Sequence, residues 1–404
     1  MPKISFQKNP QIPSFLINDY QITESLWNSY NWQMQNSIKN ILDFKKYFKL
    51  SDSEEQAFKN SEAVFNIRTT PYYASLCKDV ESDPIRKILM PSLQELKSEY
   101  QEMLDPLGEK VNLKTPRLIH RYSDRVLFLV TDFCSVYCRY CTRKHFTGNE
   151  LSFLKAKEFE ESLSYIKSHP GIREVILSGG DPLTLSNNII DNILNEIRKI
   201  EHVEIIRIGS RMPVVCPQRI DEDLLKTMRR YKPVYLMTHF NHPRELTEIA
   251  AEKLEMIVDH GIPTFNQMVL LNGINNHEAI VQALSRRLLY LRVKPYYMFQ
   301  CDPSLGTDHL RTSLEDSLTI QRNLWGHLSG LAMPQLSLDI PNGGGKAYFV
   351  PSFSLERTHR SIKFQGWDGV QGEYINPSDE TITKPLDLED YMKEWETLKA
   401  AKTC

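Results

Sequence analysis

The spacing of apolar residues changes along the chain near residue 115. Before that point apolar residues recur at helical spacing over 22–48, and a second amphipathic stretch covers 84–104. A polar turn beginning at Ser51 separates the two stretches. Neither stretch carries a chemical motif. The pattern therefore predicts an N-terminal helical domain over 1–115 whose role is packing.

Beyond that domain, short β-branched runs alternate with longer amphipathic segments. Predicted strands cover 126–131, 174–177, 203–208, 234–239, 264–271 and 296–300. Predicted helices cover 155–168, 187–200, 221–230, 245–259 and 278–291. This alternation indicates parallel βα units, and about six of them form a full or partial barrel. In such barrels the chemistry lies at the C-terminal ends of the strands.

The pattern changes again after residue 330. Two predicted strands flank a glycine-rich turn, and a polar tail leads to a predicted helix over 386–400. The sequence therefore predicts an α/β fold, a partial (β/α)6 TIM-like barrel over 116–330. A C-terminal segment over 331–404 carries the glycine-rich turn and the tail.

Composition excludes several classes of protein. The net charge of -2 shows no basic excess, which argues against nucleic acid and for a small-molecule substrate. No stretch approaches the roughly 18 apolar residues needed to span a membrane, and no secretory signal is visible. We expect a cytoplasmic protein. Of the 7 cysteines, three lie within 134–141 and the others are scattered, which indicates a metal cluster and not a disulfide framework.

The three clustered cysteines follow the first predicted barrel strand. Cys134, Cys138 and Cys141 have the spacing CxxxCxxC, and three thiolates can hold three irons of a cubane while the fourth iron stays open. Structural zinc normally takes four ligands, and no partner pair of cysteines is present. We predict a [4Fe–4S] cluster. This spacing, with Tyr140 before the last cysteine, resembles the signature of radical S-adenosylmethionine (SAM) enzymes.

A glycine turn ends the second predicted strand. It reads Ser178-Gly179-Gly180-Asp181, and glycines let a backbone approach a ligand closely. Asp181 could take an ammonium group. A plain tight turn is the alternative, and the position one βα unit after the cysteine loop favours a ligand site.

Lys346 follows three glycines in the C-terminal segment. The spacing of a P-loop is absent, and Ala347 stands where that motif needs serine or threonine. A lysine on a flexible loop can instead form a Schiff base with an aldehyde such as pyridoxal 5′-phosphate (PLP). A surface glycine turn is the alternative.

Charged residues near other predicted strand ends complete the candidates. Two arginines around a tyrosine could hold a phosphate and a ring, or they could line an exposed strand end. Unpaired carboxylates in a barrel mouth would suit an ammonium, or they could lie on the surface. The candidates are Arg121, Tyr122, Arg125, Arg143, Asp302 and Asp339.

Together these motifs resemble the lysine 2,3-aminomutase family, whose members are PLP-dependent radical SAM enzymes. The likeness covers most of the chain, in phrases such as HRYSDRVLFLVTDFCSVYCRYCTRKHF, ILSGGDPL and PNGGGK. It implies an isomerase in which a 5′-deoxyadenosyl radical and PLP move the amino group of L-lysine, giving L-β-lysine. The implied cofactor residues are Lys346, Arg121, Tyr122 and Arg125 for PLP, Cys134, Cys138 and Cys141 for the cluster, and Tyr140, Ser178, Gly179, Gly180, Asp181 and Gln267 for SAM.

The resemblance also bears on the substrate. It implies that Arg143 binds the substrate carboxylate and that Asp302 and Asp339 hold the lysine ε-ammonium. The related glutamate 2,3-aminomutase replaces both aspartates, and two carboxylates would repel a dicarboxylic substrate. Lysine is therefore favoured, and arginine is the alternative because a guanidinium also pairs with carboxylates.

Some family features are altered in this sequence. His277 stands where the family places a zinc-binding cysteine, the tail region 381–388 lacks cysteine, and Cys404 is isolated. We therefore expect no zinc, which leaves the family's tetramer open and allows another homo-oligomer. Asn342 replaces one glycine of the lysine loop, a change we expect to be tolerated. Expected partners are an amino acid and an electron donor such as flavodoxin or ferredoxin.

Two other functions remain open. A radical SAM enzyme acting on a macromolecule such as tRNA would share the cysteine motif, although the near-neutral charge and Lys346 speak against it. A non-enzymatic iron–sulfur carrier would not need the other motifs.

Overall fold

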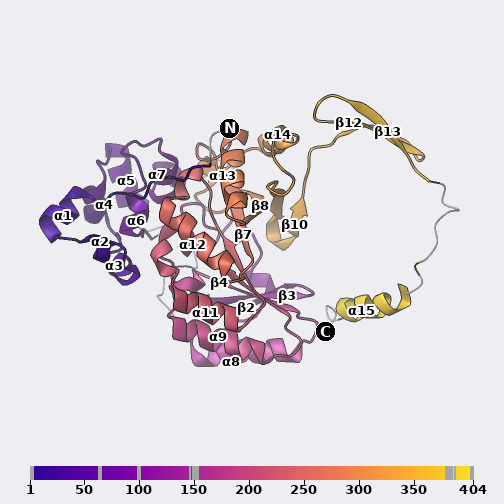
Figure 1. The fold of residues 1–404 in the computed structure, drawn as a ribbon, viewed down its shortest axis with the longest axis horizontal. Helices are drawn as coiled ribbons and strands as arrows, with labels where there is room; N and C mark the ends of the chain where they lie inside the picture. The colour runs from indigo at the N-terminus through magenta and orange to yellow at the C-terminus, as the bar shows by residue number, and fades with distance from the viewer. Residues whose placement is uncertain are drawn as a thin grey trace.

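The centre of the computed structural model is a ten-stranded sheet whose strands follow one another in chain order (Figure 1). The structure describes residues 4–61, 66–97, 102–144, 147, 154–377, 385 and 388–400. The strands are β1 Leu113–Thr115, β2 Leu118–Tyr122, β3 Arg125–Thr131, β4 Glu174–Gly179, β5 Ile205–Gly209, β6 Val234–Thr238, β7 Thr264–Leu270, β8 Lys294–Gln300, β9 Gln335–Ile340 and β10 Gly345–Tyr348.

The parallel part of this sheet runs from β3 to β9, and β1, β2 and β10 are added at its two edges in antiparallel pairing. The six strands predicted for the barrel are β3 to β8, so the predicted partial (β/α)6 barrel is confirmed. Because β9 and β10 continue the same sheet, the glycine-rich turn between them lies at the edge of the barrel. The domain boundaries near 115 and 330 stay predictions.

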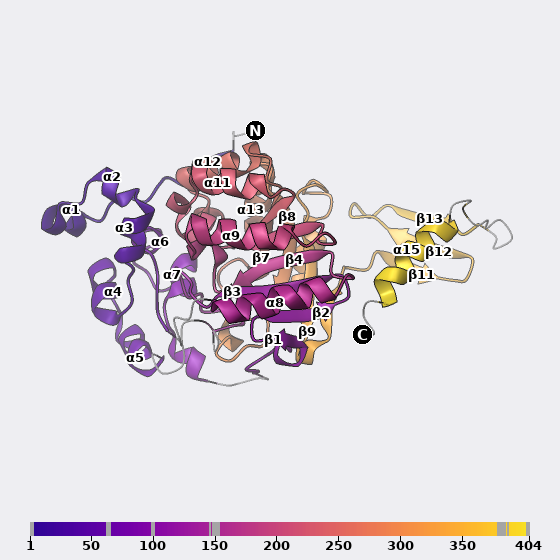
Figure 2. The same ribbon diagram turned by 90° about the horizontal axis from the view of Figure 1, so that it is seen from below.

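Helices follow the parallel strands and cover the sheet (Figures 1 and 2). They are α8 Ala156–Ser168, α9 Asn187–Arg198, α11 Glu222–Arg230, α12 Glu248–Asp259, α13 Glu278–Tyr290 and α14 Leu314–Leu324. Their apolar faces are buried, as at Ile190, Ile193, Leu194 and Ile197 of α9. The first five were predicted, whereas α14 was not. Short helices in the connecting loops are η3 Pro182–Thr184, α10 Met212–Val215, η4 Pro217–Arg219, η5 Pro243–Glu245, η6 Asp308–Leu310 and η7 Pro341–Gly343.

The N-terminal region is helical but more broken than predicted. Its elements are α1 Ser14–Tyr20, α2 Glu24–Trp27, α3 Tyr30–Gln35, α4 Ile41–Tyr47, α5 Asp52–Ser61, α6 Pro71–Ala74, α7 Pro84–Leu89, η1 Leu93–Leu96 and η2 Lys110–Asn112. The predicted continuous helix over 22–48 is wrong, because the side chains of Ser29 and Asn40 cap new helices within it. The stretch over 84–104 stops at Leu89, since Met90 precedes a proline and is extended.

The C-terminal segment beyond β10 stands away from the barrel (Figures 1 and 2). It forms a separate antiparallel sheet of β11 Ser354–Arg357, β12 Ser361–Gln365 and β13 Gln371–Ile375, followed by α15 Leu388–Ala400. The predicted helix over 386–400 is confirmed from residue 388, whereas 386–387 and Cys404 lie outside the described residues. Among the helices that the structure describes, none is long and apolar enough to cross a membrane.

Candidate active site

A cavity of about 690 Å³ opens at the C-terminal ends of the parallel strands. Every site residue predicted from the sequence lines it, although these residues come from positions 121 to 346 of the chain. The sheet order explains part of this convergence, because parallel neighbours present their carboxyl ends, and the loops that follow them, at one edge. The remaining residues come from antiparallel pairs at the two edges of the sheet: Arg121, Tyr122 and Arg125 from the β2–β3 pair and Lys346 from the β9–β10 pair. The structure thus brings the candidates together, while the role of each one stays a prediction.

The cysteine loop follows β3 and is fixed by backbone hydrogen bonds. The amide of Cys141 donates to the carbonyl of Cys138 at 3.0 Å, and the amide of Arg143 donates to Cys141 Sγ at 3.3 Å. Burial raises the pKa of the Cys134 and Cys141 thiols, so an electron-poor metal centre is what would favour their thiolate form. The described residues include no group of three His, Cys, Asp or Glu side chains placed to hold one metal ion. In a cubane each thiolate ligates its own iron, so the three sulfur atoms need not converge on a single ion.

The glycine turn after β4 packs directly against the cysteine loop. Gly179 has a φ of +123°, and a Cβ there would lie 2.1 Å from the carbonyl oxygen of Thr131. The amides of Gly180 and Asp181 donate to Thr131 O at 2.6 Å and Phe133 O at 2.8 Å. Glycine is therefore required because two backbones touch, a reason that differs from the ligand approach inferred from the sequence.

The carboxylate of Asp181 is engaged within the protein. It accepts hydrogen bonds from Leu183 N at 3.0 Å, Ser210 Oγ at 2.7 Å and Arg211 N at 2.7 Å, and the residue is 5% exposed. These contacts join the ends of β4 and β5. Its role as an ammonium partner for SAM stays a prediction, and the hydrogen bonds give it a second, structural role.

Lys346 points into the cavity beside two carboxylates. Its Nζ lies 2.8 Å from Asp339 Oδ2, and its backbone amide donates to the Tyr122 hydroxyl at 3.0 Å. Register places Lys346 opposite Asp339 across the β9–β10 pair. Asn342, in the turn between these strands, has a φ of 60°, a left-handed conformation that asparagine tolerates better than most residues. The expected tolerance of this replacement is consistent with that geometry.

Asp302 lies in the same cavity without a hydrogen-bonded cation among the described residues. Desolvation, and then the nearby charge of Asp339, raise the pKa of Asp302 from 3.8 to about 7, whereas Lys346 and Arg311 act in the opposite direction. A cationic ligand beside this carboxyl group would favour its ionised form.

The residues predicted to hold PLP have the form of an anion site. Nη2 of Arg121 is buried and has no hydrogen-bond partner within the described part of the chain, while Nη1 donates to Leu107 O at 3.1 Å. The Arg125 guanidinium lies 3.9 Å from the centre of the Tyr122 ring. A Cβ at Gly345 would lie 3.2 Å from Arg121 Nη2. An unsatisfied guanidinium nitrogen next to a lysine fits a phosphorylated aldehyde.

Arg143 is paired with a residue that the sequence did not single out. Its guanidinium contacts the carboxylate of Glu109, with Nε 2.9 Å from both oxygens, and Nη1 donates to Ser178 Oγ at 3.2 Å. Glu109 lies next to η2, in a polar loop that no motif marks. The Glu109 carboxylate thus already contacts the Arg143 guanidinium, which is the group predicted to bind the substrate carboxylate.

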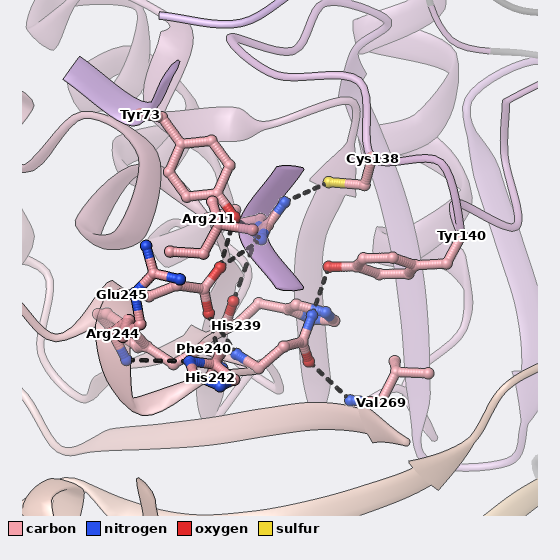
Figure 3. A network of polar contacts seen from close by, with 12 residues as sticks. Tyr73, Cys138, Tyr140, Arg211, His239, Phe240, His242, Arg244, Glu245 and Val269 are labelled. Carbon is pink, nitrogen blue, oxygen red and sulfur yellow. Dashed lines mark hydrogen bonds and ion pairs between the residues drawn. The ribbon is translucent and has the colours of Figure 1, made fainter. Parts of the chain in front are cut away.

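Two further residues that the sequence did not single out, Arg211 and His239, contact the cysteine loop. Arg211, which follows β5, reaches Cys138, and His239 stacks on Tyr140 with ring centres 5.6 Å apart (Figure 3). The imidazole stays neutral because burial, aided by the charge of Arg211, lowers the pKa of His239 to about 3. Isolated polar residues of this kind have no spacing rule, so only the fold could reveal them.

A parallel αβ sheet with a three-cysteine loop at the carboxyl end of its first barrel strand defines a radical SAM enzyme. The family model described as "Radical SAM superfamily" matches residues 128–284, and the family model described as "Lysine-2,3-aminomutase" matches residues 321–402. The chain belongs to the lysine 2,3-aminomutase family, because it is 41% identical to L-lysine 2,3-aminomutase of Fusobacterium nucleatum over 93% of this chain and 88% of that protein. It is an aminomutase of the isomerase class, and the family's cofactors are a [4Fe–4S] cluster, SAM and PLP.

Two further proteins are similar to the chain. The chain is 37% identical to glutamate 2,3-aminomutase of Clostridioides difficile, over 92% of this chain and 87% of that protein. Among solved structures, "Native anSMEcpe with bound AdoMet" matches at a TM-score of 0.41 and 13% identity, covering 49% of this chain and 58% of that one. Because relatives named for lysine and for glutamate are both similar to this chain, the residues of the cavity bear on the choice of substrate.

Proposed function

We propose that this chain is an L-lysine 2,3-aminomutase that moves the amino group of L-lysine from Cα to Cβ and so interconverts L-α-lysine and L-β-lysine. The observation that carries the choice of substrate is the pair of carboxylates, Asp302 and Asp339, in one cavity with Lys346. When bound, the cluster and SAM supply a carbon-centred radical, and PLP supplies a ring that delocalises the unpaired electron during nitrogen migration.

The two carboxylates favour a cationic side chain. Asp302 has a raised pKa because its charge is poorly solvated and lies near Asp339, so the ε-ammonium of lysine would relieve both effects. A glutamate side chain would bring a third negative charge into the same space. That mismatch argues against the glutamate 2,3-aminomutase activity of the Clostridioides difficile relative. An arginine side chain stays the alternative.

The amino acid's other end would meet Arg143. A guanidinium binds a carboxylate through two parallel N–H donors, which orients the amino acid as well as holding it. Because Glu109 now makes those contacts, an incoming carboxylate must displace it, or share the guanidinium with it. Lys346 would carry PLP, with Arg121 contacting its phosphate and Tyr122 close to its ring.

Product analysis tests the proposal directly. The full chain, reconstituted with iron and sulfide, is incubated without oxygen with SAM, PLP, a reductant and one of lysine, arginine or glutamate. We expect the β-amino acid from lysine at a rate at least about tenfold above that from arginine. Preferred turnover of arginine or glutamate would overturn the choice of substrate.

The lysine itself needs a matched control. Lys346→Ala should abolish turnover and remove the visible absorption that PLP acquires on bonding to a lysine. Lys363→Ala removes an exposed lysine of β12, which pairs with Glu356 outside the cavity, and should leave both properties unchanged. Full activity in Lys346→Ala would exclude it as the PLP carrier.

The setting of the enzyme is also proposed. A cluster that must be reduced needs an electron donor, such as flavodoxin or ferredoxin, and a reducing compartment such as the cytoplasm. Assembly into a homo-oligomer through the exposed C-terminal sheet is consistent with the apolar side chains of Phe364, Tyr374 and Ile375 on it. Sedimentation of the full chain against one truncated after residue 350 tests that contact.

A further inference from the structure

A buried arginine outside the cysteine loop contacts one of the loop's thiols. Arg211 lies between β5 and α10, and its Nη1 donates to Cys138 Sγ at 2.6 Å (Figure 3). The two residues are 73 positions apart, so the end of β5 brings a cation to the cysteine loop that follows β3. None of the sequence motifs requires a charged residue here.

The orientation of this guanidinium is set by its other donors. Nη2 lies 2.8 Å from both Glu245 Oε1 and the Tyr73 hydroxyl, and Nε donates to His239 O at 3.4 Å. The Arg211 side chain is 10% exposed, so water offers few competing partners. With those donors engaged, Nη1 is left to face the sulfur.

Glu245 cannot turn away from the arginine. Its Oε2 accepts hydrogen bonds from the amides of Asn241 at 2.6 Å and His242 at 2.9 Å, and its Oε1 accepts from the Tyr73 hydroxyl at 2.5 Å. The side chain of Glu245 is fully buried. A buried carboxylate that accepts this many hydrogen bonds is held in one orientation, and it therefore anchors Arg211.

Tyr73 brings the N-terminal region into this network. It belongs to α6, and its ring is fully buried with the Arg211 guanidinium 5.1 Å from the ring centre. The N-terminal helices, which carry no motif, thus supply one of the contacts that hold the arginine. His239, which also borders the site, is neutral, so the positive charge facing Cys138 comes from Arg211.

From this geometry we propose that Arg211 is a positioning residue that donates a hydrogen bond to the Cys138 sulfur and thereby raises the reduction potential of the cluster, with Glu245 and Tyr73 holding it in place. The inference rests on the proposed function for the presence of the cluster. Hydrogen bonds and positive charge at a ligating sulfur stabilise the more negative, reduced form of an iron–sulfur cluster. Without the contact, the cluster would be harder to reduce.

A redox titration of the reconstituted full chain, followed by electron paramagnetic resonance in the absence of SAM and amino acid, tests this directly. We expect Arg211→Met to move the midpoint to a more negative potential. The equilibrium constant for one-electron reduction should fall at least tenfold, which corresponds to about 59 mV. Arg211→Lys keeps the charge but loses the second donor of the fork, and should shift the midpoint in the same direction by less.

Arg207→Met is the matched control. Arg207 lies on β5, lines the same cavity and is ion-paired with Glu174, not with a cysteine, so its loss should change the equilibrium constant less than threefold. A midpoint in Arg211→Met equal to that of the wild type, or to that of Arg207→Met, would overturn the inference.

Tyr73→Phe provides a second route if Arg211→Met fails to retain a cluster. It deletes one hydroxyl and should move the midpoint in the same negative direction, whereas unchanged midpoints in both Tyr73→Phe and Arg211→Lys would refute the proposal. The titration contains no amino acid, so failure of lysine turnover leaves its result intact. Conversely, an unshifted midpoint leaves the aminomutase assignment standing.

Discussion

Replacing Asp302 by asparagine should stabilise the protein while it damages the reaction. Asparagine has nearly the shape of aspartate but carries no charge. The pKa of Asp302 is raised from 3.8 to about 7, mainly by desolvation and then by Asp339, so the folded protein holds an ionised group at a cost. The variant removes that cost, and with it a carboxylate that we assign to the substrate's ammonium.

The size of the gain follows from linkage. Each pH unit between the folded and unfolded pKa is worth about 1.4 kcal/mol, so the charge costs about 4 kcal/mol when it is fully ionised. Since the pKa is raised on folding, the folded state binds more protons than the unfolded state between about pH 4 and 7. The stability of the wild type therefore falls as the pH rises across that window. Because the new amide also needs partners, we expect Asp302→Asn to gain about 2–4 kcal/mol at pH 8.

Urea unfolding of the cofactor-free chain at pH 8 and pH 5 measures this effect. The gain should be largest at pH 8 and should shrink toward pH 5, where much of the cost disappears. Asp339→Asn is the control, because it deprives the Lys346 ammonium of its partner at 2.8 Å and should therefore not stabilise the protein.

Turnover should move the other way. In Asp302→Asn, kcat/KM for lysine should fall about 100-fold, since losing one carboxylate from a partly buried charge contact costs about 3 kcal/mol. In the wild type, kcat/KM should decline below about pH 7 as Asp302 protonates, and the variant should lose that limb. A variant that is less stable at pH 8, or that keeps wild-type turnover, would refute the reasoning.

Three further outcomes are expected. Glu109→Gln should lower KM for lysine by up to about tenfold in steady-state assays, because a neutral amide competes less well for Arg143, and a raised KM would contradict this. Arg121→Met should weaken PLP binding by at least about tenfold in an absorbance titration, since a guanidinium–phosphate contact is lost, whereas unchanged affinity would remove Arg121 from the site. Cys141→Ser should lose most bound iron while Cys77→Ser retains it, and equal iron contents would contradict the cluster assignment.

Sequence patterns anticipated the parts of the fold that follow local rules. Strands β3 to β8 are short, largely apolar runs of β-branched and aromatic residues, and α9 has one apolar face, so these patterns are visible without a structure. The long helix predicted over 22–48 failed because Ser29 and Asn40 cap new helices within an amphipathic run. Strands β11 to β13 were missed since exposed strands carry no alternation of buried and exposed positions.

The chemistry of the chain could be predicted from the sequence in the same way where the reacting groups are close in sequence. Cys134, Cys138 and Cys141 lie within one loop, so their spacing was enough to predict the cluster. The glycines before Lys346 left a surface turn as an alternative, and the resemblance to the family was needed to favour PLP. The pairing of Arg143 with Glu109 and of Arg211 with Cys138 could not be predicted from the sequence. Those contacts join segments 34 and 73 positions apart, and only the tertiary structure, which places the loop before β1 and the end of β5 beside the cysteine loop, brings them within hydrogen-bond distance.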